Sequence, residues 1–388
     1  MSLWRRISAS TSLSPEGEQY IAVFGYQTAS GHDPNLSLVA YPFDAVNGFG
    51  TRIEQTTGFY LVDTYSGGMD FTPSGAALNL AINPTNVNSP IGGTELVSLQ
   101  WDEGFGSLYT SQPTVVNPST VEFHPDGDVL FLSDIGGASY GTRIKAFNWS
   151  DSTGAGSEIG SYVTVSNPTQ GFVPIAVSPN GNFVAVGYSN SAHLEVYPFN
   201  KSTGFGTKQE APNNTSNTVF DVAWNNAGTY VAVAGNGYDG EHRLNIYEWD
   251  NATGTFGSKV SGVSVEPLNT TQVSVFSVIF APDDEAIILG CDGGSVDKLQ
   301  AYEWDNATGT FGSKYTSATG TSGGAPRDLK FNTNGTVLFA GGGSVATHPV
   351  HAWEWDSSTG FGAKYDNADN SGYSQTFYFH SLAYIDLG

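Results

Sequence analysis

The chain has 388 residues and a formal net charge of −23, with 37 acidic and 14 basic side chains. So few lysines and arginines cannot build the basic surface that binding to nucleic acids or anionic membranes requires. Nucleic acids and anionic membranes are therefore excluded as partners. The aromatic content of 13% equals the charged content and argues against a disordered chain.

The chain contains an internal repeat. An apolar residue, one intervening residue and an aromatic residue recur seven times, each time followed within a few residues by a glycine hairpin. The spacing between copies is 48 to 58 residues, and the sequence of residues 247–259 is repeated identically at 302–314. In chain order the third positions of this signature are Phe43, Trp101, Trp149, Phe199, Trp249, Trp304 and Trp355.

A second signature, a turn rich in Pro, Asn and Gly between two apolar runs, recurs seven times in phase with the first. It occupies residues 14–17, 72–75, 124–127, 178–181, 225–228, 281–284 and 332–335. In the fourth unit the two signatures separate four short strands, which we predict at 174–177, 182–188, 194–199 and 205–208. Alternation along the second of these strands places Phe183 and Val184 on opposite sides. No window has the apolar period of a helix.

Seven units of four short strands predict an all-β fold, a seven-bladed β-propeller of antiparallel blades that forms one domain over residues 1–388. Blades diverge away from the axis, so we expect the large rings of the third strand, such as Tyr247 and Trp249, to fill the gap between blades. A further apolar segment, 376–387, follows the seventh unit. Because an open ring would leave a free sheet edge, we predict that this segment pairs with N-terminal strands in a shared closing blade.

We expect binding residues on one face of the propeller. The connections after the first and third strands of each unit are nearly constant, whereas the other two vary in length and share one face. Loops on a rigid scaffold commonly carry binding, so this variable loop face is the predicted contact surface. The candidates on it are His32, His193, Tyr238, Asp239, His242 and His348. The histidines belong to different units, so no metal site is predicted, and solvated loop histidines remain the alternative.

Ionisable residues are also expected beside the central axis. Asp70, Glu122, Asp221 and Asp328 fall in predicted innermost strands, with Lys330 close by in the sequence of the last one. We predict that these side chains line a water-filled channel as structural groups. A catalytic pair of carboxylates among them is the alternative.

Several motifs of common catalytic sites are missing from the sequence. It has no His-Glu-x-x-His zinc motif and no phosphate-binding glycine loop, and its single cysteine, Cys291, excludes a cysteine-rich zinc site. We therefore predict a protein without catalytic residues, metal or cofactor, which is not an enzyme. A lactonase-like propeller is the strongest enzymatic alternative, because its turns look similar.

Three motifs resemble a known family. The turn at 178–181, the aromatic strand at 197–199 and the glycine hairpin at 204–208 resemble the WD-repeat-like propeller arrays of tailed phages. The resemblance covers nearly the whole chain and implies a non-enzymatic structural or adhesive component of a virion. Such a protein decorates the head or belongs to the tail. It contacts another virion protein or a host-surface glycan through its variable loop face, alone or as a homo-oligomer within the particle.

The same hypothesis places the protein in the virion after assembly in the host cytoplasm. No apolar run follows Arg5 and Arg6, and the most apolar stretch, 273–281, is too short to cross a bilayer, so neither a signal peptide nor a transmembrane segment is expected. The alternatives to a virion protein are the lactonase-like enzyme and a bacterial protein-interaction scaffold.

Overall fold

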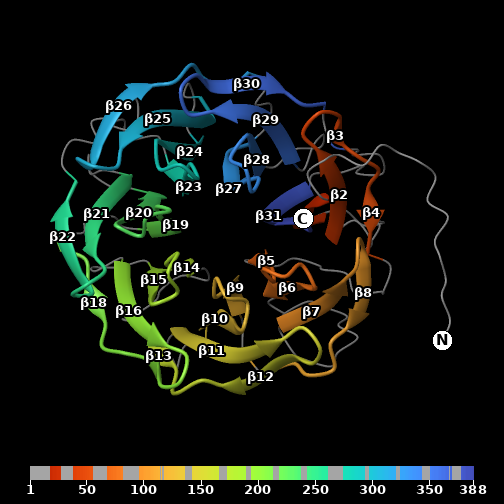
Figure 1. Ribbon diagram of the computed structural model, residues 1–388, viewed down its shortest axis with the longest axis vertical. Helices are drawn as coiled ribbons and strands as arrows, with labels where there is room; N and C mark the ends of the chain where they lie inside the picture. The colour runs from red at the N-terminus through yellow and green to blue at the C-terminus, as the bar shows by residue number, and fades with distance from the viewer. Residues whose placement is uncertain are drawn as a thin grey trace.

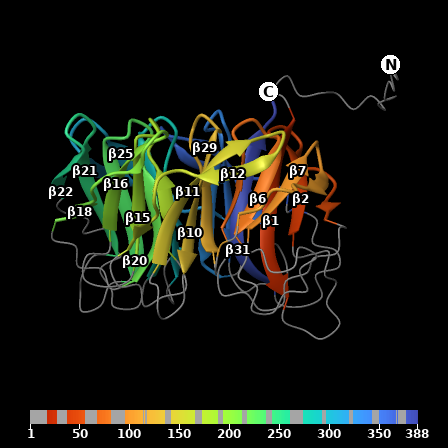
Figure 2. The same ribbon diagram turned by 90° about the horizontal axis from the view of Figure 1, so that it is seen from below.

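Seven antiparallel sheets stand around a common axis, which confirms the predicted seven-bladed propeller. Figure 1 views this ring along its axis, and Figure 2 shows it edge-on as a disc. The computed structural model describes residues 18–27, 38–55, 68–81, 96–113, 115, 118–135, 142–165, 173–188, 194–212, 218–236, 243–260, 274–292, 297–319, 324–342, 350–366, 368 and 377–388. Within these ranges, no helix has the length and apolar character needed to cross a membrane.

Each blade runs from an innermost strand beside the axis to an outermost strand at the rim (Figure 1). The first blade comprises β31 (Phe377–Asp386), β1 (Gln19–Gln27), β2 (Leu38–Asp44), β3 (Gly48–Phe49) and β4 (Ile53–Glu54). The second comprises β5 (Met69–Phe71), β6 (Ala77–Ala81), β7 (Leu96–Trp101) and β8 (Phe105–Leu108). The third comprises β9 (Pro118–Phe123), β10 (Val129–Ile135), β11 (Thr142–Ser150), β12 (Gly154–Glu158) and β13 (Val163–Thr164).

The remaining blades repeat this order of strands. The fourth comprises β14 (Ile175–Val177), β15 (Phe183–Gly187), β16 (Leu194–Asn200), β17 (Gly204–Phe205) and β18 (Gln209–Glu210). The fifth comprises β19 (Thr218–Trp224), β20 (Tyr230–Asn236), β21 (Leu244–Asp250) and β22 (Thr255–Lys259). The sixth comprises β23 (Ser274–Phe280), β24 (Ala286–Asp292), β25 (Leu299–Asp305) and β26 (Thr310–Lys314). The seventh comprises β27 (Pro326–Phe331), β28 (Val337–Gly342), β29 (Val350–Asp356) and β30 (Gly360–Lys364).

Local sequence explains the turn between the two inner strands of a blade. In the fourth blade, Gly181 has a φ of +71°, which residues with a Cβ rarely adopt. The Gly181 N–H donates to the Ser178 carbonyl at 2.8 Å, and the Phe183 N–H donates to the Ser178 hydroxyl at 3.0 Å. In this turn the serine hydroxyl therefore accepts a backbone hydrogen bond, and the glycine adopts the positive φ.

Side chains that alternate along each strand form the seams between blades. Phe183 of β15 packs with Tyr247 and Trp249 of the fifth blade, whereas its neighbour Val184 packs with Phe131 of the third. The rings of Phe183 and Trp249 meet edge to face, with centroids 5.0 Å apart. The expected alternation and the expected role of the third-strand aromatics are both confirmed.

The ring closes through a shared blade, as predicted. Strand β1 pairs antiparallel with β31, in a register that runs from Gln19 opposite Asp386 to Gln27 opposite Phe377. Strand β31 thereby supplies the innermost strand of the blade whose other strands are β1 to β4 (Figure 1).

Candidate functional site

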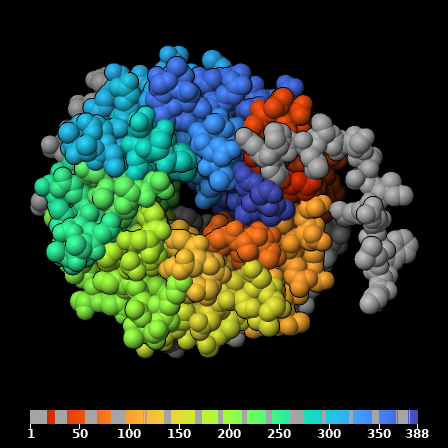
Figure 3. Space-filling model, viewed as in Figure 1, coloured from red at the N-terminus to blue at the C-terminus, as the bar shows by residue number. Residues whose placement is uncertain are grey.

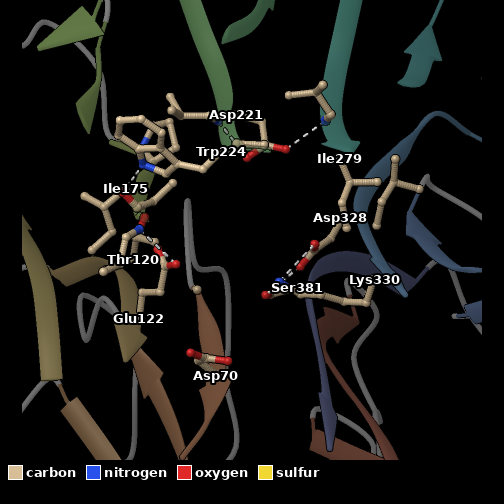
Figure 4. Close-up of a pocket in the computed structure, with 18 of the residues that line it drawn as sticks. Asp70, Thr120, Glu122, Ile175, Asp221, Trp224, Ile279, Asp328, Lys330 and Ser381 are labelled. Atoms are coloured by element: carbon tan, nitrogen blue, oxygen red, sulfur yellow. Dashed lines mark hydrogen bonds and ion pairs between the residues drawn. The ribbon is translucent and has the colours of Figure 1, made fainter. Parts of the chain in front are cut away.

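The innermost strands enclose a cavity on the propeller axis, where the space-filling view in Figure 3 shows a central hollow. Its volume is about 440 Å³, which is within the range of small-molecule sites. Four carboxyls and one ammonium group line it: Asp70 on β5, Glu122 on β9, Asp221 on β19, and Asp328 and Lys330 on β27. Figure 4 shows these side chains around the cavity.

Strand alternation places the ionisable side chains at two levels along the axis. Asp70, Glu122 and Lys330 each lie two residues before the turn that follows their strand, whereas Asp221 and Asp328 lie four residues before theirs. Residues two positions apart on a strand face the same side, so Asp328 and Lys330 both face the cavity.

A backbone N–H of the next blade around the ring holds each carboxyl. The donors are Phe123 to Asp70 at 3.1 Å, Val177 to Glu122 at 3.0 Å, Val278 to Asp221 at 2.8 Å, and Leu382 to Asp328 at 2.8 Å. The Ser381 hydroxyl also donates to Asp328, at 2.9 Å. These hydrogen bonds join four neighbouring pairs of blades, so the carboxyls belong to the scaffold and to the cavity wall at once.

Enclosure by the ring raises the pKa of three carboxyls. Burial raises the pKa of Asp70 to about 6, that of Asp221 to about 7 and that of Glu122 to about 8. The backbone donors oppose these rises because they favour the charged form, whereas the charge of Asp70 adds to the rise at Glu122. At neutral pH Glu122 therefore holds a proton while Asp70 is ionised. Carboxyls with separated pKa values are the usual source of an acid and a base in one site.

Lys330 contributes positive charge to this group of carboxyls. Its Nζ lies 3.9 Å from Asp328 Oδ1. The surrounding carboxylates, Asp328 first, raise the pKa of Lys330, which outweighs the opposing effect of burial. The ammonium group is therefore charged at neutral pH.

A stack of side chains that the sequence did not predict lies at the start of three innermost strands. Strands β19, β23 and β27 each carry a bulge there, at Phe220, Phe276 and Arg327. The two phenyl rings stack with centroids 4.5 Å apart, and the Arg327 guanidinium carbon lies 4.8 Å from the Phe276 centroid. Both Phe220 and Arg327 line the cavity. The longer spacing from Asp221 and Asp328 to their turns is the signal by which these longer strands could have been recognised.

A metal ion fits poorly at the one three-ligand group that the described ranges bring together. His124, Asp126 and Asp128 place their ligand atoms within 4.8 Å of one another. However, Lys201 Nζ already lies 2.6 Å from Asp126 and 2.7 Å from Asp128, and His124 Nδ1 accepts the Asp126 N–H at 3.1 Å. The lysine ammonium takes the place of a cation, so we assign no metal to this group.

The residues predicted for the variable loop face lie outside the described residues. They are His32, His193, Tyr238, Asp239, His242 and His348. Their role stays a prediction. The candidate site whose side chains and hydrogen bonds the structure describes is the cavity on the axis.

Comparison with known proteins gives a family and several similar folds. The family model described as lactonase, seven-bladed β-propeller, matches residues 91–361. A protein from Lactobacillus plantarum is 13% identical, with a TM-score of 0.70 over 95% of this chain and 100% of that one. A candidate 6-phosphogluconolactonase from Bacteroides uniformis is 11% identical, with a TM-score of 0.67 and the same coverage. The periplasmic gluconolactonase PpgL of Pseudomonas aeruginosa is 12% identical, with a TM-score of 0.63 and again the same coverage. No curated protein sequence matches the chain.

These findings overturn the functional hypothesis drawn from the sequence. The resemblance to phage propeller arrays and the assignment to a virion are wrong, because the matching family is that of lactonases. The expectation that the protein is not an enzyme is wrong for the same reason, because the family that matches is described as lactonases. The motifs at 178–181 and 204–208 are typical of the turns of a propeller, and propellers with many unrelated functions contain such turns.

Proposed function

Because the chain belongs to the lactonase family of seven-bladed β-propellers, we propose that it hydrolyses the ring ester of a small lactone in the axial cavity. The observation that carries this proposal is the cavity wall shared by Lys330 and three carboxyls whose pKa values are raised and separated. A cavity of about 440 Å³ accommodates a five- or six-membered lactone ring with its substituents.

We assign Asp221 as the general base. Its pKa of about 7 suits proton abstraction from water at neutral pH. The water oxygen bonds to the lactone carbonyl carbon as its proton passes to Asp221. The carbonyl oxygen becomes negatively charged, and the Lys330 ammonium stabilises it by electrostatic attraction in an enclosed site.

We assign Glu122 as the general acid. With a pKa of about 8, this carboxyl holds a proton at neutral pH and can donate it to the ring oxygen as the ester C–O bond breaks. The ring oxygen becomes an alcohol and the carbonyl carbon becomes a carboxylic acid, which loses its proton to solvent. Asp221 returns its proton through solvent to Glu122. Burial keeps Glu122 protonated between turnovers, and the negative charge of ionised Asp70 adds to this effect because it also raises the pKa of Glu122.

The test is hydrolysis of a panel of five- and six-membered lactones by the purified protein, followed by titration of the acid released above the spontaneous rate. Asp221→Asn, Glu122→Gln and Lys330→Met should each lower kcat by at least about 100-fold. Glu158→Gln, an exposed carboxyl on β12, is the matched control and should keep full activity. Hydrolysis that survives all three cavity variants would refute the assignment.

A further inference from the structure

The charges around the axial cavity restrict what can enter it. Four carboxyls line the cavity, and Lys330 and Arg327 are the cationic side chains in its wall. Lys330 is already attracted to the ionised carboxyls of the wall, Asp328 first, and the Arg327 guanidinium lies over the ring of Phe276. We propose that this cavity takes a lactone that carries no charge and excludes lactones that bear a phosphate or carboxylate group. This inference rests on the proposed function and names the substrate class of the same site.

The rest of the chain offers few cations to an anionic substrate. Twelve of the 14 lysines and arginines lie in the described ranges, the exceptions being Arg5 and Arg6. Eight of the twelve form ion pairs with carboxylates there: Arg52, Arg143, Lys145, Lys201, Lys208, Lys298, Lys314 and Lys330. Arg327 is thus the one cavity-lining cation, among the residues described, without an ion pair there.

The connections outside the described ranges bring no further lysine or arginine. Between residues 28 and 376, these segments contain neither residue, and they contain seven acidic ones: Asp33, Asp63, Glu95, Asp239, Glu241, Glu266 and Asp369. These connections therefore supply seven of the 37 acidic residues behind the net charge of −23 and none of the 14 lysines and arginines.

The consequence is electrostatic selection. A phosphate dianion in the cavity would approach several carboxylates with two cations to offset them, and enclosure strengthens this repulsion relative to bulk water. A neutral lactone escapes the repulsion, and its hydroxyl groups can hydrogen-bond to the carboxyl oxygens of the wall. Hydrolysis then converts the neutral substrate into a carboxylate anion. The carboxylates of the wall do not repel the neutral lactone, but they repel its anionic product, and this repulsion promotes product release.

The experiment compares glucono-1,5-lactone with its 6-phosphate at pH 7.5 and low salt. The neutral lactone should have a kcat/KM at least tenfold higher, equivalent to about 1.4 kcal/mol. Added salt should narrow this ratio, because it screens the repulsion. Arg327→Met removes a cation from the cavity wall, so it should lower kcat/KM for the phosphorylated lactone more than for the neutral one and widen the ratio. A phosphorylated lactone that is turned over as well as the neutral one, or better, would overturn the inference.

A binding measurement separates this inference from the proposed function. Titration calorimetry with 1,5-anhydroglucitol and with its 6-phosphate uses ring analogues that cannot be hydrolysed. If the protein hydrolyses neither lactone but binds the neutral analogue more tightly, the proposed function fails and the charge selection stands. Tighter binding of the phosphorylated analogue, or binding of neither, contradicts the charge selection.

Discussion

Replacing Glu122 with glutamine measures how much the protonation of this carboxyl contributes to the stability of the fold at neutral pH. Burial raises the pKa of Glu122 from 4.5 to about 8, so the folded protein keeps a proton that the unfolded chain has already released. The contribution of this group to stability is complete below pH 4.5 and is lost as the pH rises through 8. Glutamine is neutral at every pH, and its amide oxygen can accept the Val177 N–H as the carboxyl does.

The size of the effect follows from the pKa difference. One pKa unit corresponds to about 1.4 kcal/mol. Between pH 5 and pH 7, the free energy of unfolding of the native protein should therefore fall by up to about 3 kcal/mol relative to Glu122→Gln. Water inside the cavity screens part of this cost, so this value is a ceiling. It is still large beside the total stability of an ordinary domain, about 5–15 kcal/mol.

The assay is denaturant unfolding of both proteins at pH 5, 6, 7 and 8, followed by tryptophan fluorescence. The quantity of interest is the difference in unfolding free energy between variant and native protein, which should grow with pH. Glu158→Gln, which removes an exposed carboxyl from β12, should give a difference that does not change with pH. A flat difference for Glu122→Gln would show that Glu122 is ionised in the folded protein at neutral pH and would refute the reasoning.

Three further predictions concern activity, strain and closure. The pH profile of kcat/KM should be bell-shaped, rising as Asp221 ionises near pH 7 and falling as Glu122 ionises near pH 8; a profile flat from pH 5 to 9 would contradict both assignments. Gly342→Ala should destabilise the fold by about 2 kcal/mol or more, because φ is +155° and the new Cβ would lie 2.4 Å from the Ala325 carbonyl oxygen. Gly156→Ala, whose nearest neighbour would be 3.4 Å away, is its control, and equal melting temperatures would count against the argument. Deleting residues 377–388 should abolish cooperative thermal unfolding, since β1 then lacks its inner partner; a sharp calorimetric transition in the truncated protein would speak against that view.

The blade count could be predicted because each blade needs the same local chemistry. Gly181 and the glycines at the same turn position supply a backbone conformation that most other residues avoid, and rings such as Trp249 fill the gap between neighbouring blades. The placement of Asp70, Glu122, Asp221 and Asp328 near the axis followed from the same repeat. Closure by β31 was also predictable, because a propeller ring without it leaves an open edge.

The chemistry of the site depends on features that a repeat does not encode. The hydrogen bond from Val177 to Glu122 depends on the register between neighbouring blades, and the pKa of Glu122 depends on the enclosure that all seven blades create. The Phe276 and Arg327 contact depends on bulges in two different strands. The functional hypothesis was wrong because turn motifs identify the propeller and say nothing about what lines its axis.

Closure through β31 also sets an order of events during synthesis. At about 5–20 residues per second, a ribosome needs roughly 20 to 70 seconds to pass from β1 to β31. During that interval the inner edge of β1 has no partner from β31. Ser381 lies in the cavity wall, and its neighbour Leu382 donates the backbone N–H that holds Asp328. A chain whose synthesis ends within the seventh blade therefore has most of its blades but lacks the residues that complete the site.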